Sequence, residues 1–466
     1  MPRLQAYHLH YLDDLCSQAA LREPETFGWL VDRWLADNAG ASGVCWEPYV
    51  LSRCIVNLCK WRMAGAKWSP GVIDSVATRA DLLSRTVERD VLGNHIVANA
   101  VALVFAGQVL AGPLGARLDE LGRGLLAEQL PRQVLPDGGH YERSPMYHAV
   151  VTEDLLDVLN VLGAEQSPFA DFVRDNVRRM LAALDVLTMD DGRIALFNDS
   201  AFDGCRETSV IRAYAARLGL GCGPAEEDER FRVLPQTGCV NVRLGGWNLV
   251  LDAGDVGPEE QAGHAHADSL SFELAVDGVR LLVDPGTSTY ETGPLRALQR
   301  GTSSHNTLCV DGADSSEVWG AFRTARRART TLREARADGA EVVVQAQHDG
   351  YERLRPPVWH RRTWLVTSST LAIEDALLGA GEHDVAVGFL VAPDAAAELV
   401  YPFQCLLRRP GVCIRLHLDH SLRWQVEPAA WYSRFGSEEN TQRITGRGRV
   451  MAPVSMACSF ERCAVD

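Results

Sequence analysis

The sequence predicts a chain of two domains that differ in fold class: antiparallel helical hairpins first, and an antiparallel β-sandwich after them. Three observations support this. The 466 residues exceed what one ordinary hydrophobic core holds. Up to about residue 220 the apolar residues recur with a helical period. After the polar stretch at 221–238 the period shifts towards two, which is typical of strands.

The helical part begins with a stripe on the segment ETFGWLVDRWLADN, formed by Phe27, Leu30, Val31, Trp34 and Leu35. Short breaks of Gly, Pro and Asp separate the next helical runs, which indicates hairpins. These runs cover about 50–64, 94–110, 116–130, 150–163, 168–187 and 208–219. The run 94–110 is apolar almost all round, so we expect an inner helix of a two-layer ring.

The second part consists of short apolar segments between Gly, Asp and Pro signals, and no comparable helical pattern interrupts them. We expect strands at CVNVRL, NLVLDAG, LSFELAV, VRLLVD, EVVVQAQ, TWLVTSS, LAIED and CIRLHLD. The domain boundaries that follow are 1–225 for the helical domain and 236–466 for the sandwich.

The bulk composition restricts the partners. Hydrophobic residues make up 46% of the chain and charged residues 23%, as in a globular protein. A net charge of −15 argues against nucleic acid or an anionic membrane as the main partner. The N-terminus shows no basic segment followed by an apolar one, so we expect a cytoplasmic location. The twelve cysteines form no CxxC pair and are expected to be reduced thiols.

The segment HAHADSLSFEL at 264–274 carries the clearest chemical signal. If it is a strand, His264, His266 and Asp268 share one face. His266, Asp284 and His305 could then form a nitrogen and oxygen site for zinc, which leaves His264 for chemistry. Unrelated surface histidines are the alternative. HxHxD spacing also occurs in metallo-β-lactamase-type sites, but Ser269 stands where those commonly have histidine.

The position of Asp284 raises a geometric difficulty. A two-residue hairpin at Asp277-Gly278 pairs Val276 with Val279, and this places Asp284 opposite Ser271, on the wrong face. A bulge at Gly278 would shift the strand register by one residue and move Asp284 to the other face of its strand.

Two polar clusters occur in the helical part. Asn94 and His95 follow Gly93 at the start of the inner helix, where a helix cap is the alternative interpretation of Asn94. The loop DGGHYERSPMYH at 137–148 gathers Tyr141, Glu142, Arg143, Tyr147 and His148 before a helix. The alternative interpretation is a loop that only caps the following helix and packs against the rest of the fold.

The ordered set of motifs resembles the heparinase II/III-like polysaccharide lyases, including the related oligoalginate lyases. The matching stretches are HLHYLDDL, WEPYVLSRCIVNLCKW, GNH, DGGHYERSPMYH, LFNDS, HAHADSLSFEL, LLVDPGTSTY and SSHNTL. The resemblance implies an N-terminal (α/α) toroid as the catalytic domain, an antiparallel β-sandwich, and an active site between them.

The resemblance also implies roles for single residues. Asn94 and His95 would neutralise a uronate carboxylate, Tyr147 and His264 would be the acid and base, and His266, Asp284 and His305 would hold one mainly structural zinc ion. Neutralising the carboxylate matters because the C5 proton of a uronate is weakly acidic, and charge stabilisation is the largest expected contribution. The candidates for substrate binding are Glu142, Arg143, Tyr290, Arg296 and Arg300, with solvated surface arginines as the alternative for the arginines.

The predicted function is β-elimination at a uronic-acid glycosidic bond, with a uronate-containing oligosaccharide or glycoside as substrate. Two alternatives stay open. One is a biosynthetic lyase or zinc-dependent enzyme of the same fold that acts on a small metabolite, since three protein ligands also suit hydrolysis. The other is a non-catalytic carbohydrate-binding relative. The sequence also leaves a homodimer open.

Overall fold

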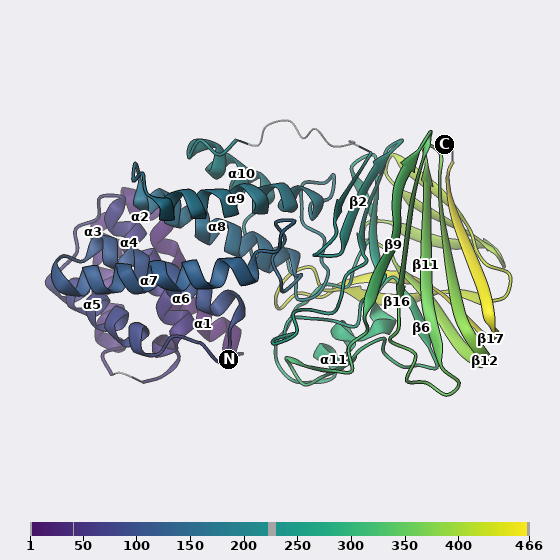
Figure 1. The fold of residues 1–466 in the computed structure, drawn as a ribbon, viewed down its shortest axis with the longest axis horizontal. Coiled ribbons are helices and arrows are strands. Elements are labelled where there is room, and N and C mark those ends of the chain that lie inside the picture. The colour runs from purple at the N-terminus through teal and green to yellow at the C-terminus, as the bar shows by residue number, and fades with distance from the viewer. Residues whose placement is uncertain (1, 41, 222–229, 464–466) are drawn as a thin grey trace. The chain divides into compact units, whose positions relative to one another are not determined.

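The computed structural model describes residues 2–40, 42–221 and 230–463 (Figure 1). The chain divides into two compact units. The helical unit comprises Met1–Gln133, Val151–Val177 and Arg217–Leu220, and the sheet unit comprises Val134–Val150, Arg178–Ala216 and Gly221–Asp466. Two segments from the helical part of the sequence therefore pack with the sheets. The domain ranges 1–225 and 236–466 stay a prediction.

Each predicted helical run corresponds to a helix, and further helices occur outside the predicted runs. Their bounds are α1 Arg3–Tyr11, α2 Gln18–Arg22, α3 Pro24–Asp37, α4 Pro48–Met63, α5 Pro70–Arg85, α6 Gly93–Val109, α7 Gly112–Gln133, α8 Pro145–Leu162, α9 Pro168–Val186, α10 Thr208–Arg217 and α11 Pro294–Arg300. Short 3₁₀ helices, η1 to η3, occupy Asp13–Cys16, Val44–Trp46 and Thr302–Ser304. Within the described part of the chain, no helix has both the length and the apolar character needed to cross a membrane.

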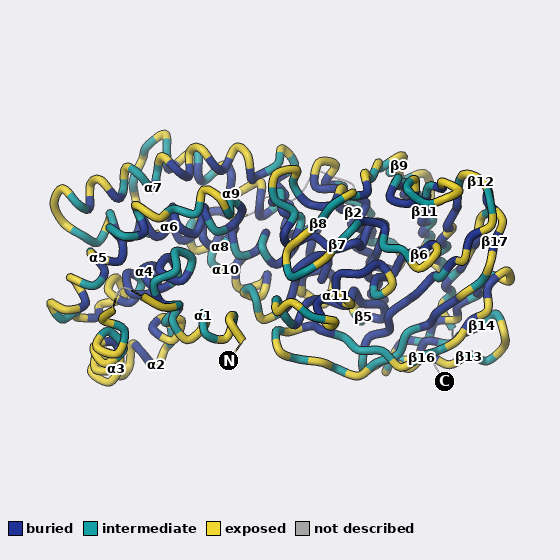
Figure 2. The backbone as a smooth tube through the Cα atoms, turned by 90° about the horizontal axis from the view of Figure 1, so that it is seen from below, coloured by how far each residue is buried: buried dark blue, intermediate teal, exposed yellow. Residues whose placement is uncertain are grey.

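The inner helix of the helical unit is α6, as predicted from its apolar run. Its residues from Ile96 to Ala106 are all buried (Figure 2). It packs against α4 on one side and α7 on another. Gly122 of α7 allows the close approach, because a Cβ there would lie 2.7 Å from the carbonyl oxygen of Ala100. Burial on several faces explains why the run has no polar stripe.

Helix α5 corresponds to no predicted run, although its start carries a recognisable signal. The Ser69 side chain accepts a hydrogen bond from the Val72 amide, and Pro70 occupies the first helical position. Both are common N-terminal features of helices. A second difference is that α8 begins at Pro145, five residues before the predicted run, so the end of the 137–148 loop is already helical.

The strands form antiparallel sheets. Their bounds are β1 Phe231–Leu234, β2 Cys239–Leu244, β3 Trp247–Asp252, β4 Phe272–Val276, β5 Val279–Leu282, β6 Leu308–Val310, β7 Glu317–Trp319, β8 Arg323–Ala325, β9 Thr330–Asp338, β10 Glu341–His348, β11 Val358–Thr367, β12 Thr370–Leu390, β13 Ala396–Tyr401, β14 Gln404–Arg409, β15 Val412–His417, β16 Arg423–Trp431 and β17 Glu439–Arg462. One sheet has five strands in the order β1-β2-β3-β4-β5. A second sheet has ten strands, and β7 pairs with β8 alone.

The two larger sheets share one hydrophobic core, which confirms the predicted sandwich. Side chains of β2 to β5 pack in the same buried cluster as those of β10 to β12, β14, β15 and β17. Phe272 of β4 and Phe389 of β12 meet edge to face, with ring centroids 6.1 Å apart. Each fully buried ring contributes about 1.5–3 kcal/mol from the loss of exposed apolar area.

The β4–β5 hairpin has the expected two-residue turn and the expected β-bulge, but the bulge lies at a different residue. Val276 pairs with Val279, and both turn residues, Asp277 and Gly278, have the positive φ that a two-residue hairpin requires. A register shift follows, because Ala275 pairs with Arg280 but Leu274 pairs with Leu282. The extra residue is thus Leu281. The bulge exists, but it lies in β5 and not at Gly278.

A buried polar network in the ten-stranded sheet supports the loops between the sheets. Arg362 of β11 forms two hydrogen bonds with the Asp375 carboxylate of β12, and His360 donates to the same carboxylate over 2.6 Å. Arg362 also donates to the carbonyl oxygens of Leu270 and Asn306. Burial opposes ionisation of Asp375, but Arg362 and His360 hold the pKa of this carboxyl below its usual value.

This network predicts a specific pH dependence of stability. Because the pKa of Asp375 is lowered in the folded state, its contribution is present above the unfolded pKa of about 3.9 and is lost as the pH falls below it. At neutral pH, Asp375→Asn should lower the free energy of unfolding by about 3–5 kcal/mol. The difference from the unchanged protein should shrink in acid, as urea unfolding at several pH values can measure.

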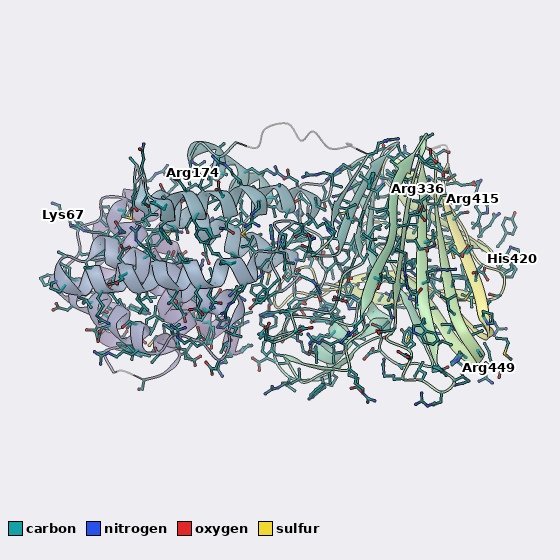
Figure 3. All side chains as sticks on the ribbon, viewed as in Figure 1. Lys67, Arg174, Arg336, Arg415, His420 and Arg449 are labelled. Atoms are coloured by element: carbon teal, nitrogen blue, oxygen red, sulfur yellow. The ribbon has the colours of Figure 1, made fainter. Side chains whose placement is uncertain are left out.

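Asp384→Asn is the matched control. Asp384 pairs with Arg449, but both side chains are 62% exposed, and Arg449 projects from the surface in Figure 3. The unfolding curve of this variant should overlay that of the unchanged protein, because water screens such pairs. An equal effect of the two substitutions would contradict the role given to the buried network.

Candidate active site

The loop that carries Glu142, Arg143 and Tyr147 is held in a fixed shape before α8. Gly138 has a φ of +88°, and a Cβ on it would lie 2.2 Å from the carbonyl oxygen of Arg179. Ser144 then donates to the carbonyl of Asp199 over 2.7 Å and accepts from the Tyr147 amide over 3.2 Å. Tyr147 therefore projects from the first turn of α8, and the Ser144 side chain, which caps this helix, fixes its position.

The segment 264–268 is not a strand, which corrects the sequence prediction. The strand β4 begins only at Phe272, and the preceding residues have irregular backbone. They pair instead with residues 198–199: the Asp199 amide donates to the carbonyl of His264, and the His266 amide donates to the side chain of Asn198. Polar side chains that bond to nearby backbone compete in this way with a strand ladder.

Tyr147 and His264 lie against each other within the sheet unit. The centroids of their rings are 4.1 Å apart, and the hydroxyls of Tyr147 and Tyr290 are 2.9 Å apart in a hydrogen bond. Phe322 packs edge-on against the His264 ring at 5.7 Å and against Tyr290 at 5.3 Å. The structure therefore brings together two phenols, an imidazole and an aromatic wall.

The carboxylate of Asp199 links the two histidines of the HAH segment. Its Oδ2 lies 2.8 Å from His264 Nδ1, and its Oδ1 lies 2.9 Å from His266 Nε2. Arg296 forms hydrogen bonds with both oxygens. Burial opposes ionisation of Asp199, but Arg296 and the two imidazoles hold the pKa of the carboxyl well below its usual value.

Glu142 is the other carboxylate beside His264. Its side chain is almost fully buried, and its Oε2 lies 3.7 Å from His264 Nε2. His264 thus stands between two carboxylates, one on each ring nitrogen. His148, from the same loop as Glu142, is bonded on both nitrogens within the fold, to the His140 amide and the Met180 carbonyl. The geometry of His148 favours the packing interpretation.

The predicted metal ligands His266 and His305 are neighbours, but the acidic residue beside them is Asp268 and not the predicted Asp284. Ligand atoms of His266, Asp268 and His305 all lie within 4.8 Å of one another, and all three residues are buried. Asp284 instead accepts a hydrogen bond from His305 Nδ1 at 2.8 Å. Among the described residues, His266 Nδ1 and His305 Nε2 have no hydrogen-bond partner.

These two buried nitrogens fit a metal ion. A buried imidazole nitrogen normally has a partner, and a carboxylate on the opposite nitrogen is the usual support of a histidine that binds metal. Asp199 supports His266 in this way, and Asp284 supports His305. Burial lowers the pKa of His266 to about 3, which keeps its ring neutral, as a ligand must be. Burial also opposes a charge on His305, but the Asp284 carboxylate raises the pKa of that ring, so a metal ion there must displace a proton.

The predicted substrate-binding arginines are occupied inside the protein. Arg296 is fully buried on Asp199, and Arg300 is fully buried with its guanidinium on the carbonyls of Ala265, Trp319 and Gly320. The structure therefore favours positioning roles for both, rather than the direct contact with a substrate expected from sequence. Arg143, which is half-buried, donates to the carbonyls of Gly257 and Gln236.

Asn94 and His95 belong to the helical unit. Both lie in the first turn of α6, where Leu92 is the N-cap residue, so Asn94 is not the cap. Asn94 is buried, whereas the His95 side chain is 27% exposed. His95 is held by Glu88, 3.0 Å from its Nδ1, and packs on the ring of Tyr49 at 4.5 Å.

Sequence reasoning did not single out Asp199, Asn198 or Phe322. Asn198 and Asp199 lie in the motif LFNDS, to which the resemblance assigns no role. The positive φ of Asn198, 56°, is a signal that appears only in the structure. Phe322 is part of the turn between β7 and β8 and carries no sequence pattern of its own.

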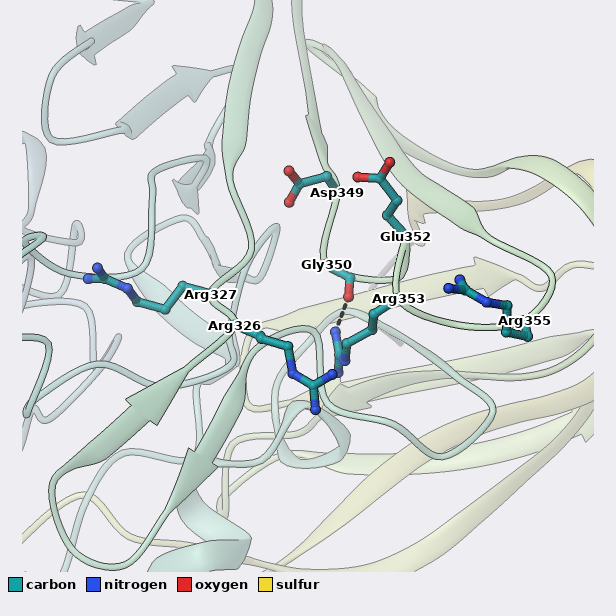
Figure 4. Close-up of a pocket in the computed structure, with 7 residues that line it drawn as sticks. All are labelled: Arg326, Arg327, Asp349, Gly350, Glu352, Arg353 and Arg355. Carbon is teal, nitrogen blue, oxygen red and sulfur yellow. Dashed lines mark hydrogen bonds between the residues drawn. The ribbon is translucent and has the colours of Figure 1, made fainter.

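A separate hollow of about 320 Å³ lies between Arg326 and Arg327 and the loop after β10, which includes Arg353 (Figure 4). Its arginines already have partners. Arg326 pairs with Glu317, Arg327 donates to the carbonyl of Glu259, and Arg353 donates to that of Gly350, as Figure 4 shows for the last.

Family models match most of the chain. The model described as Heparinase II/III-like, C-terminal, covers residues 226–461, and the one described as Heparinase II/III N-terminus covers residues 72–218. The chain belongs to the heparinase II/III-like family. The crystal structure of heparinase III superposes with a TM-score of 0.76 at 16% identity, over 100% of this chain and 77% of that one. This likeness confirms the predicted fold class, a helical toroid and a β-sandwich.

Two curated proteins are similar to parts of the chain. The FtsZ-localized protein C of Caulobacter vibrioides is 27% identical over 69% of this chain and 53% of its own length. A heparin-sulfate lyase of Bacteroides thetaiotaomicron is 22% identical over 66% of this chain and 47% of its own length. The chain spans about half the length of these relatives.

The Gly138 geometry predicts a destabilised loop on substitution. Gly138→Ala should lower the free energy of unfolding by at least about 1 kcal/mol, because of the positive φ and the clash with Arg179. Chemical denaturation measures this loss. Gly124→Ala is the control, since Gly124 lies within α7 with open space around its Cα. That substitution should raise stability by about 0.5–1 kcal/mol, and a loss of the size expected at Gly138 would contradict the argument.

Proposed function

We propose that the chain is a lyase that cleaves a uronate-containing oligosaccharide or glycoside by β-elimination. The observation that carries the proposal is the contact of Tyr147 with His264, together with the hydroxyl contact of Tyr147 with Tyr290. A β-elimination needs one group to remove the C5 proton and another to protonate the leaving oxygen, each worth about 10²–10⁴-fold in rate. A phenol and an imidazole in contact can divide these two tasks.

The charge pattern around His264 supports its part in this proposal. A carboxylate on Nδ1 orients the ring and stabilises it when Nε2 accepts a proton. Nε2 faces the Glu142 side, 3.7 Å from that carboxylate. We assign proton transfer to Tyr147 and His264, and we assign neutralisation of the uronate carboxylate to Asn94 as an amide donor with His95.

The names of the relatives agree with this chemistry. The Bacteroides thetaiotaomicron relative is named a heparin-sulfate lyase, and the superposed structure is named heparinase III. The buried arginines Arg296 and Arg300 leave Glu142, Arg143 and Tyr290 as the substrate-binding candidates of the sheet unit. The acidic net charge of −15 favours short substrates over long polyanions.

The metal proposal rests on the two buried imidazole nitrogens. We propose that His266 and His305 hold one zinc ion together with the carboxylate of Asp268, while Asp284, expected from sequence as a ligand, supports His305 through its Nδ1. When bound, such an ion crosslinks the segments that carry its ligands and adds to folding stability.

Cytoplasmic location stays a prediction.

The test of the function is direct. The purified chain is incubated with a panel of uronates that differ in epimer, sulfation and length, and the ultraviolet absorbance of the conjugated unsaturated product is followed. Mass spectrometry should identify an unsaturated product without added water. Products that carry added water would indicate hydrolysis and overturn the proposal.

A non-catalytic role is the second candidate, because one relative is named for its localisation with FtsZ and not for an activity. The same panel separates the two. Binding of a uronate, measured by calorimetry, without any unsaturated product would favour the binding role.

Tyr147→Phe should lower kcat by about 10²–10⁴-fold with the fold intact, because it removes only the hydroxyl that takes part in proton transfer. Initial rates on the best panel substrate measure the effect. Tyr401→Phe is the control, since Tyr401 on β13 is 67% exposed. Full activity of Tyr147→Phe would remove Tyr147 from the mechanism.

The purified protein should contain close to one zinc ion per chain, and His266→Ala should lose both the metal and thermal stability. Elemental analysis and melting curves measure these. His383→Ala is the matched control, because His383 is equally buried but bonded to Asp311, away from the cluster. This variant should keep its zinc. Parent protein that binds none, even after incubation with zinc, would contradict the site.

A further inference from the structure

We propose that Asp199 is a positioning residue that sets the tautomers of His264 and His266 at the same time. This inference rests on the proposed function for His264 and on the proposed metal site for His266. Each oxygen of the carboxylate meets a different imidazole, Oδ2 at His264 Nδ1 and Oδ1 at His266 Nε2. Asp199 is fully buried, so no water competes for these bonds.

The position of Arg296 makes the carboxylate an acceptor only. The guanidinium contributes one nitrogen to each carboxylate oxygen, a two-point ion pair that favours the ionised form. Thr287 adds a hydroxyl donor to Oδ1 at 3.2 Å. An ionised carboxylate has no proton to give. The ring nitrogens that face it must therefore carry the hydrogen.

The consequence for each histidine is different. In His264 the proton on Nδ1 leaves the lone pair on Nε2, the nitrogen on the side of Glu142. In His266 the proton on Nε2 leaves the lone pair on Nδ1, which has no hydrogen-bond partner and can serve as the ligand atom in the cluster with Asp268 and His305. One carboxylate thus prepares one imidazole for proton transfer and the other for a metal ion.

The two-point ion pair also holds the carboxylate against rotation. Arg296 lies over the rings of Tyr290 and Phe322, with its central carbon 5.2 Å and 5.6 Å from their centroids. Its guanidinium also donates to the carbonyl of Ala321, next to Phe322. The same arginine that orients Asp199 is therefore fixed by the aromatic residues that surround His264.

A purely structural role is the alternative, and the chain contains an example of it. Asp375 likewise accepts from an arginine and a histidine, Arg362 and His360. The other nitrogen of His360 lies 3.2 Å from His348 Nε2, so that histidine is satisfied on both sides inside the core. His264 and His266 instead direct their second nitrogen to the candidate active site and to the metal cluster.

Asp199→Asn tests the inference. The amide keeps one acceptor oxygen and gains a donor, so one of the two imidazoles must change its tautomer. We expect kcat to fall by about 10²–10⁴-fold with little change in KM, and the zinc affinity to fall by about 10–100-fold. Nitrogen NMR of ¹⁵N-histidine-labelled protein should show altered ring protonation for the signals that His264→Gln and His266→Gln remove.

Glu273→Gln is the matched control. Glu273 is a buried carboxylate paired with Arg280 in the same unit, and it contacts neither histidine. It should lose stability while kcat, zinc affinity and the histidine signals stay unchanged. If Asp199→Asn behaves in the same way as this control, Asp199 is only structural and the inference is overturned.

Two further outcomes are separable. If Asp199→Asn does not fold, Arg296→Lys preserves the ion pair but not its two-point geometry, and it should lower kcat at least about tenfold. Full kcat and zinc affinity in Arg296→Lys would overturn the inference. If the parent protein eliminates no uronate, the proposed function fails, while the NMR and zinc measurements on Asp199→Asn still decide the role of Asp199.

Discussion

The buried ion pair between Asp199 and Arg296 is the constraint on which the candidate active site depends. A carboxylate without solvent must receive hydrogen bonds on both oxygens, and here they come from Arg296, His264 and His266. The bonds can form only if the segments around 199, 264 and 296 lie together. Satisfying one buried charge therefore determines where the proposed proton-transfer histidine and the proposed metal ligand stand.

The sandwich supplies the rigid support for these irregular segments. Arg362, on the ten-stranded sheet, donates to the carbonyls of Leu270 and Asn306, which flank the histidine-bearing segments in sequence. Asn306 in turn donates to the carbonyls of Phe272 and Val283 in the β4–β5 region. The backbone beside the site is thus anchored to both sheets, with the side chains of Arg362 and Asn306 as the donors.

The division into a helical part and a sandwich part could be predicted because periodicity reports burial directly. The all-round apolar run at 94–110 became the buried helix α6, and the period-two segments became strands. Helix α5 was missed although Ser69 and Pro70 mark its start. The strand expected over 264–270 was wrong, because its alternating polar residues bond to Asn198 and Asp199 and not across a ladder.

By itself the sequence determined the fold class, the family resemblance and the list of chemical groups, since these follow from local pattern and motif order. Tertiary structure alone decided which groups meet. Tyr147 and Tyr290 are 143 residues apart, yet their hydroxyls touch. The bulge at Leu281, the place of Asp268 beside two histidines, and the burial of Arg296 and Arg300 likewise depend on long-range packing. The physical reason is that buried charges and hydrogen-bond donors take whichever partner the packed chain brings within reach, and sequence spacing does not encode that distance.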